Sequence, residues 1–350
     1  SAVLTWQRSL VQVQSGLPLL YNHLMPLQTS MKQIAQILII FFLYSCGSSS
    51  SEEEASITPS QPKVVDIDPH EVGTLEKTIF HEGLLRNFIL HVPESYDRNT
   101  ATPMVFNFHG YGSNAEEQMY YSNFIEVADD EGFLVLHPQG TPHPLTGSSM
   151  FCVGGFTRPC DIDDVSFSNY LINVISTLYN LDAQRIYSTG MSNGGFMSFH
   201  LACNLSNRIA AIASVTGSMT PETYDECTPS RSIPIVQMHG LEDTVVPLVG
   251  IPNLMEPIDK VVDFWVEHNN CTAQYIVDYF DSVQWDNSIP LQNGWNGCDE
   301  GSEVRLYTFT GAGHTWPGNP YNTANTNYDI IASEEIWSFF KKHTINGSTE

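Results

Sequence analysis

Basic residues are scarce in this chain. Its 350 residues include 14 Lys and Arg against 39 Asp and Glu, which gives a formal net charge of -25 at pH 7. A surface of this sign repels the phosphates of nucleic acids and the headgroups of anionic membranes, so we expect neither as a partner. A neutral ester or polymer fits the charge better, and an adaptation of the surface to solubility explains it equally well.

Metal-binding patterns are also missing. The cysteines form no C-x-x-C pair. The acidic run Asp161-Ile162-Asp163-Asp164 lacks the remaining ligands and the glycine of a calcium loop. We interpret this run as a helix cap with one structural acid, and we expect neither a metal nor a cofactor.

The apolar stretch from Ile34 to Leu43 is too short for an ordinary transmembrane helix. It follows Lys32 and ends in Leu43-Tyr44-Ser45-Cys46, where a small residue stands directly before the cysteine. This pattern predicts a lipoprotein signal peptide over residues 31–46, with Cys46 lipidated and the lipid as the link to a membrane. An ordinary secretory signal with an incidental cysteine is the alternative.

The rest of the chain divides by composition. Residues 1–30 precede the signal and are expected to be an upstream leader outside the fold. Residues 47–70 begin with a run rich in Ser and Glu that has too little apolar surface to fold, which predicts a flexible tether. Residues 71–345 show no internal repeat and predict a single domain, secreted or held on a bacterial cell surface. No appended polymer-binding domain is expected.

Six cysteines lie in that domain, besides Cys46. An even number in an exported chain predicts disulfides, although six cysteines allow about 15 pairings. Our preferred set joins neighbours in sequence, and a free buried thiol is the alternative for any one of them. The preferred pairs are Cys152–Cys160, Cys203–Cys227 and Cys271–Cys298.

Short apolar strands alternate with helical segments along the domain. The alternation predicts a mostly parallel central sheet with helices on both faces, and the residues around Glu82-Gly83 predict an N-terminal β-hairpin. Residues 279–301 are polar and contain tryptophan, so we interpret them as an excursion near the site. The expected strands are 75–80, 85–92, 103–109, 133–137, 185–188, 209–214, 233–239 and 304–309, and the main helices are 163–179, 258–268 and 330–342.

The segment Gly190–Gly194 reads G-x-S-x-G between a strand-like run and a helix-like run. Strand, tight turn and helix with a serine at the apex form the nucleophile elbow of α/β-hydrolases. The turn crowds the backbone, so the flanking positions need glycine. This pattern predicts Ser192 as a nucleophile, whereas a plain Gly/Ser turn is the alternative.

A serine hydroxyl needs a histidine to take its proton and an acid to orient that histidine. In this fold their chain order is Ser, acid, His. Asp243 follows the strand 233–239, and His314 lies in a Gly-rich loop after the last strand. Glu242 is adjacent to the acid, and His239 is the main rival base, but only Ser192, Asp243 and His314 have both order and position.

Backbone N–H groups are expected to form an oxyanion hole. One belongs to Asn193, directly after the nucleophile, and the other to Tyr111 in the loop His109-Gly110-Tyr111-Gly112. Trp316, two residues after His314, is a candidate wall of the substrate pocket, with packing in the core as an equal alternative.

Five motifs in this order resemble the polyhydroxybutyrate-depolymerase-like esterases, which are related to the feruloyl and acetylxylan esterases of carbohydrate esterase family 1. They are H-G-Y-G at His109, D-D-V-S-F at Asp163, G-M-S-N-G-G at Gly190, H-G-L-E-D-T-V-V-P at His239 and G-H-T-W-P-G at Gly313. The resemblance covers roughly Leu75 to His343. It implies an α/β-hydrolase fold, secreted esterase activity and the triad Ser192, Asp243 and His314. Ser166 stands where glycine is commoner.

The expected function is hydrolysis of short-chain carboxylic esters or a polyester through an acyl-enzyme. A feruloyl or acetylxylan esterase acting on polysaccharide is the first alternative, because the Cys152–Cys160 segment and residues 279–301 leave the pocket shape open. An inactive surface lipoprotein that binds a polymer is the second. The complete set of Ser192, Asp243 and His314 argues against this last alternative.

Overall fold

The computed structural model describes residues 68–279, 282–283, 285–321 and 323–349. The chain divides into two units, residues 1–58 and 59–350, and the described residues all belong to the second. The predicted leader, the signal peptide with Cys46 and nearly all of the tether therefore lie outside the described residues. Within the described ranges, no helix has the length and hydropathy needed to cross a bilayer.

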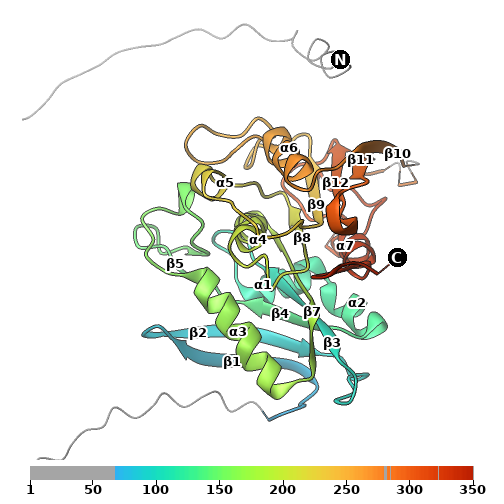
Figure 1. Ribbon diagram of the computed structural model, residues 1–350. Helices are drawn as coiled ribbons and strands as arrows, with labels where there is room; N and C mark the ends of the chain where they lie inside the picture. The colour runs from blue at the N-terminus through green and yellow to red at the C-terminus, as the bar shows by residue number, and fades with distance from the viewer. Residues whose placement is uncertain (1–67, 280–281, 284, 322, 350) are drawn as a thin grey trace, which may run out of the picture. The chain divides into compact units, whose positions relative to one another are not determined.

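A ten-stranded sheet forms the centre of the domain (Figure 1). Neighbouring strands are parallel from β4 to β12, and antiparallel strands extend both edges. Strands β3, β4, β8 and β9 are buried along their whole length, as parallel strands covered on both faces must be. In sheet order the strands are β1 (Gly73–His81), β2 (Leu84–Val92), β4 (Leu134–Pro138), β3 (Thr102–Phe108), β7 (Leu181–Met191), β8 (Ala211–Val215), β9 (Ile235–Gly240), β12 (Val304–Thr310), β11 (Ile289–Asn296) and β10 (Ala273–Asp278).

Helices pack on both faces of this sheet, and each face has its own apolar core. The core of one face takes side chains from α3 (Asp164–Leu178), α4 (Asn193–Asn204) and α6 (Ile258–His268). The core of the other face takes them from α2 (Phe124–Glu131) and α7 (Ala332–Phe340), with α1 (Ala115–Ser122) beside them. The predicted parallel sheet covered on both faces is therefore confirmed. Short elements complete the domain: α5 (Pro221–Asp225), η1 (Gly155–Thr157), η2 (Asp299–Gly301), β5 (Thr141–Pro142), β6 (Ser149–Met150), β13 (His343–Thr344) and β14 (Gly347–Ser348).

The predicted N-terminal hairpin is formed by β1 and β2. Its turn is tied to helix α3, because Ser166 Oγ donates to Glu82 Oε1 at 2.9 Å and lies 3.2 Å from His81 Nε2. Ser166, which stands where glycine is commoner, thus connects the hairpin turn to α3. At the same helix start, Asp163 accepts from the Ser166 N–H as the N-cap, and the acidic run acts as the predicted cap.

The interpretation of residues 279–301 as an excursion near the site was wrong. Ile289–Asn296 is β11, which pairs antiparallel with β12 in the central sheet. Alternate residues of β11 are buried and the others are partly or fully exposed. The buried positions hold Pro290, Gln292 and Gly294, while Ile289, Leu291 and Trp295 are more exposed, so the sequence lacks the usual alternation of apolar buried and polar exposed residues.

Three disulfides link the same pairs that were preferred from the sequence: Cys152–Cys160, Cys203–Cys227 and Cys271–Cys298. The first closes the loop that precedes α3. The second joins the end of α4 to the segment after α5. The third joins the residues after α6 to those after β11.

Candidate active site

Ser192 is the single residue between strand β7 and helix α4. Its backbone lies at φ 54° and ψ -122°, a strained conformation for a residue with a side chain. A Cβ atom added to Gly190 would lie 2.6 Å from the carbonyl oxygen of Phe108, and one added to Gly194 would overlap the same oxygen. The two motif glycines therefore allow β3 to pass next to the turn that carries Ser192.

Asp243 and His314 are joined at the carboxyl ends of β9 and β12. His314 Nδ1 lies 2.8 Å from Asp243 Oδ2. The other carboxylate oxygen, Oδ1, accepts the N–H groups of Val245 and Val246, each at 2.9 Å. The Asp243 side chain is fully buried, while His314 keeps 18% of its side chain exposed. The acid is thus held from one side by its own loop and presents its second oxygen to the histidine.

The charge state of Asp243 follows from these contacts. Burial raises the pKa of its carboxyl, but the hydrogen bond and the electrostatic attraction of His314, together with the hydrogen bond from the Val246 N–H, outweigh burial and leave the pKa below its ordinary value. An ionised carboxylate only accepts hydrogen bonds, so the proton of the His314–Asp243 bond belongs to Nδ1. The opposite ring nitrogen, Nε2, is then free to accept a proton.

His239, the rival base, is occupied elsewhere. Its Nε2 donates to the Val246 carbonyl oxygen at 2.8 Å, and its Nδ1 accepts from Gln237 at 3.0 Å. It is fully buried, and burial lowers the pKa of its imidazole. His239 is therefore a neutral scaffold residue behind the acid, and it does not line the pocket described next.

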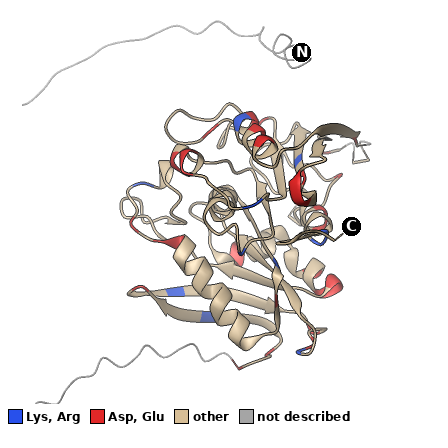
Figure 2. Ribbon diagram, viewed as in Figure 1, with Lys and Arg blue, Asp and Glu red and all other residues tan. Residues whose placement is uncertain are grey.

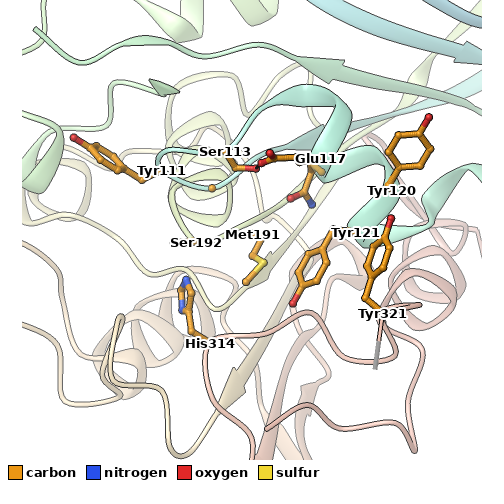
Figure 3. Close-up of a pocket in the computed structure, with 11 residues that line it drawn as sticks. Tyr111, Ser113, Glu117, Tyr120, Tyr121, Met191, Ser192, His314 and Tyr321 are labelled. Atoms are coloured by element: carbon orange, nitrogen blue, oxygen red, sulfur yellow. Dashed lines mark hydrogen bonds between the residues drawn. The ribbon is translucent and has the colours of Figure 1, made fainter. Parts of the chain in front are cut away.

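Ser192 and His314 share the lining of one pocket of about 480 Å³ (Figure 3). No hydrogen bond joins these two side chains in the structure, although both line the same pocket. Four tyrosines also line the pocket: Tyr111, Tyr120, Tyr121 and Tyr321. The rings of Tyr121 and Tyr321 are stacked, with centroids 6.4 Å apart and an interplanar angle of 11°. The pocket is therefore largely aromatic, with His314 on its wall.

The two expected oxyanion donors flank Ser192. A Cβ atom on Gly110 would lie 3.4 Å from the Ser192 Cβ, so the loop that carries Tyr111 passes against the serine. Asn193 is the first residue of α4, where N–H groups have no partner within the helix. Neither amide donates to a protein acceptor within the part of the chain that the structure describes.

The start of α4 also has a distinct charge. Among the described α-helices, only α4 has no acidic residue in its first turn. Figure 2 shows acidic residues at the ends of several other helices. Acids there would offset the partial positive charge of a helix N-terminus. The N-terminus beside Ser192 keeps that charge and can stabilise an anion.

Most of the residues that form the pocket wall were not predicted from the sequence. Tyr120, Tyr121 and Glu117 come from α1, and Tyr321 comes from the loop after His314. The adjacent tyrosines on α1 were the only available signal, because α1 follows the H-G-Y-G loop. Trp316 does not line the pocket: it is 1% exposed, and its Nε1 donates to Ser333 Oγ at 3.2 Å. Of the two roles considered for Trp316, the structure therefore shows packing in the core.

Comparison with known proteins shows that this chain is similar to esterases. The sequence profile of the phospholipase/carboxylesterase family matches residues 94–274, just over half of the chain. Feruloyl esterase B of Piromyces equi is 28% identical over 250 residues, which are 65% of this chain and 42% of that protein. A bifunctional acetylxylan esterase/xylanase of Neocallimastix patriciarum is 24% identical over 266 residues, 76% of this chain and 34% of that protein. The chain thus spans less than half the length of either relative.

Among solved structures, the acetyl xylan esterase from Aspergillus awamori resembles this chain with a TM-score of 0.53 and 13% identity, covering 73% of this chain and 93% of that one. A thermostable esterase has a TM-score of 0.51 and 15% identity, covering 77% of this chain and 63% of that one. At this identity the likeness concerns the fold, and it confirms the predicted α/β-hydrolase architecture.

Proposed function

Because the chain belongs to the phospholipase/carboxylesterase family, we propose that it is a carboxylic ester hydrolase that works as a serine esterase through an acyl-enzyme. The observation that carries this proposal is the placement of Ser192 on a strained turn, in one pocket with His314, whose Nδ1 is bound to buried Asp243. A binding protein has no need of this combination.

The proposed reaction has two halves. Ser192 Oγ attacks the ester carbonyl carbon while His314 Nε2 takes the hydroxyl proton. The oxyanion that forms accepts hydrogen bonds from the Tyr111 and Asn193 N–H groups, and the C–O bond breaks as His314 returns the proton to the leaving alcohol. Water then attacks the acyl-enzyme with the same proton transfers and releases the acid. Asp243 holds His314 in the required tautomer throughout.

Two substrate classes remain in the proposal. Feruloyl and acetylxylan esters are favoured because the relatives include a feruloyl esterase and an acetylxylan esterase. The tyrosine rings of the pocket also suit an aromatic or a small acyl group. Short-chain esters or a polyester are favoured by the largely apolar lining and by the absence of Lys and Arg among the residues that line the pocket.

We also propose that the protein acts outside the cytoplasm of a bacterium, anchored through Cys46 by the tether of residues 47–70. Three disulfides in the described domain support export, because such bonds persist in oxidising compartments.

The testing experiment compares wild type with Ser192→Ala on p-nitrophenyl acetate and butyrate. We expect turnover by wild type alone, and equal rates for the two proteins would refute the serine mechanism. Release of ferulate from methyl ferulate, of acetate from acetylated xylan, and of hydroxybutyrate from a polyhydroxybutyrate film then separates the substrate classes.

A further inference from the structure

Asn193 is proposed to stabilise the oxyanion through its backbone N–H, which requires no particular side chain. Its side chain nevertheless makes two hydrogen bonds. Its Oδ1 accepts the Phe151 N–H at 2.7 Å, and its Nδ2 donates to the Phe151 carbonyl oxygen at 3.1 Å. Asn193 and Phe151 are both fully buried. The first residue of α4 is therefore clamped to the main chain of a segment 42 positions away in the sequence.

That segment reaches both proposed oxyanion donors. The carbonyl oxygen of Ser149 accepts the Gly112 N–H at 2.7 Å, directly after Tyr111. Two residues further on, Phe151 carries the clamp to Asn193. Residues 149–151 thus bridge the two sides of the site and set the gap between the two N–H groups.

The bridge is itself fixed from behind. Asp164 Oδ2 accepts the Cys152 N–H at 2.8 Å, and Asp164 Oδ1 lies 2.6 Å from Arg86 Nη2 in a buried ion pair. The Cys152–Cys160 disulfide ties Cys152 to the segment that precedes α3. A group held this firmly cannot follow small movements of α4, so it can hold the Asn193 N–H in place.

We propose that the Asn193 side chain is a positioning group of the oxyanion hole, acting through the main chain of Phe151. This inference rests on the proposed function. Preorganised donors stabilise the transition state because they need no rearrangement when charge develops. Loss of the clamp would let the N–H drift while leaving the pocket that binds the ground state intact. The expected loss is therefore in kcat and not in KM.

The chain contains a matched control. Asn269 is also fully buried, and its side chain clamps Ile233 with the same pair of bonds, at 3.0 Å and 2.7 Å. This second clamp lies at the amino end of β9, whereas Ser192, Asp243 and His314 lie at the carboxyl ends of the strands. Asn269→Ala therefore removes an equivalent clamp without touching the site.

The experiment measures kcat and KM for p-nitrophenyl butyrate, and inhibition by phenylboronic acid, which forms a tetrahedral adduct with a reactive serine. For Asn193→Ala we expect kcat to fall about tenfold to a hundredfold, KM to stay within about threefold, and phenylboronic acid to inhibit correspondingly more weakly. Asn269→Ala should lose similar thermal stability but keep kcat within about twofold of wild type.

Two outcomes with an active wild type would overturn the positioning role. Either kcat falls no further in Asn193→Ala than in Asn269→Ala, or the activity lost in Asn193→Ala results from a higher KM. A wild type that neither turns over the ester nor responds to phenylboronic acid refutes the proposed function, and the positioning role with it. If Asn193→Ala does not fold, Cys152→Ser/Cys160→Ser replaces it, with Cys271→Ser/Cys298→Ser as control. Only the first pair should lower kcat, and equal effects of the two pairs overturn the proposal.

Discussion

His109 Nδ1 lies 2.7 Å from the carbonyl oxygen of Gly110, in the peptide group that carries the Tyr111 N–H. Across the ring, Nε2 accepts the Gly140 N–H at 3.0 Å. Burial lowers the pKa of His109 to about 4, so the ring is neutral at pH 7 and its single proton sits on Nδ1. The histidine of the H-G-Y-G motif thus orients the peptide plane of a proposed oxyanion donor.

We therefore expect His109→Ala to lower kcat for p-nitrophenyl butyrate by about tenfold or more, because the Tyr111 peptide loses its fixed orientation. His200→Ala is the control: His200 is a half-buried histidine whose pKa burial also lowers to about 4, but it lies in α4, bonds Thr223 of α5 and does not line the pocket. Equal kcat values for the two variants would exclude a positioning role for His109.

Replacement of the acid should be far more damaging than replacement of its neighbour. Asp243→Asn offers no carboxylate to hold the Nδ1 proton of His314, and we expect kcat to fall by about 10⁴-fold. Glu242→Gln changes an adjacent exposed acid and should alter kcat by less than about twofold. A similar loss in both variants would mean that the loop, and not the carboxylate of Asp243, supports activity.

The same carboxylate makes stability depend on pH in the acid range. The pKa of Asp243 is lower in the folded protein than its ordinary value, so ionisation favours the folded state. Its contribution is fully present above the unfolded pKa of about 4 and is lost as pH falls through the folded pKa. The melting temperature of wild type relative to Asp243→Asn should therefore decrease between about pH 5 and pH 2. A constant difference in thermal melts across this range would contradict the lowered pKa.

The residues of this site that could be predicted are those that lie in a local sequence motif. Ser192 could be found because a strained turn demands glycines at fixed positions, and Asp243 and His314 because loops after parallel strands meet at one sheet edge. Tyr321 and the Asn193–Phe151 clamp could not, since they depend on contacts between distant segments. Strand β11 was missed because its buried positions hold Pro290, Gln292 and Gly294, and none of these is a large apolar residue of the kind that marks a strand in the sequence.

Tyr321 offers a test of the pocket. It is 59% exposed, stacks with Tyr121, and lines the same pocket as Ser192. If this pair holds an aromatic acyl group, Tyr321→Ala should raise KM for methyl ferulate by about twofold to tenfold and leave p-nitrophenyl acetate nearly unchanged. Tyr321→Phe should keep the wild-type KM. Trp285→Ala, at an equally exposed aromatic outside the pocket, is the control. Parallel changes for both esters would place the aromatic acyl group elsewhere.

The buried pair of Arg86 and Asp164 should dominate the stability of the segment behind the site. Both side chains are almost fully buried, and the guanidinium carbon of Arg86 also lies 3.9 Å from the centroid of the Phe167 ring. Asp164→Ala leaves a buried cation without its partner, and we expect a loss of about 3–5 kcal/mol in the free energy of unfolding. Arg158→Ala breaks an exposed ion pair with Glu222 and should cost less than about 1 kcal/mol. Urea titrations compare the two variants. The cost of Asp164→Ala is expected to come from the unpaired charge of Arg86. The double variant Arg86→Met/Asp164→Leu removes that charge and should therefore recover part of the lost stability. A double variant that is less stable than Asp164→Ala would show that the pair stabilises the fold by direct attraction instead.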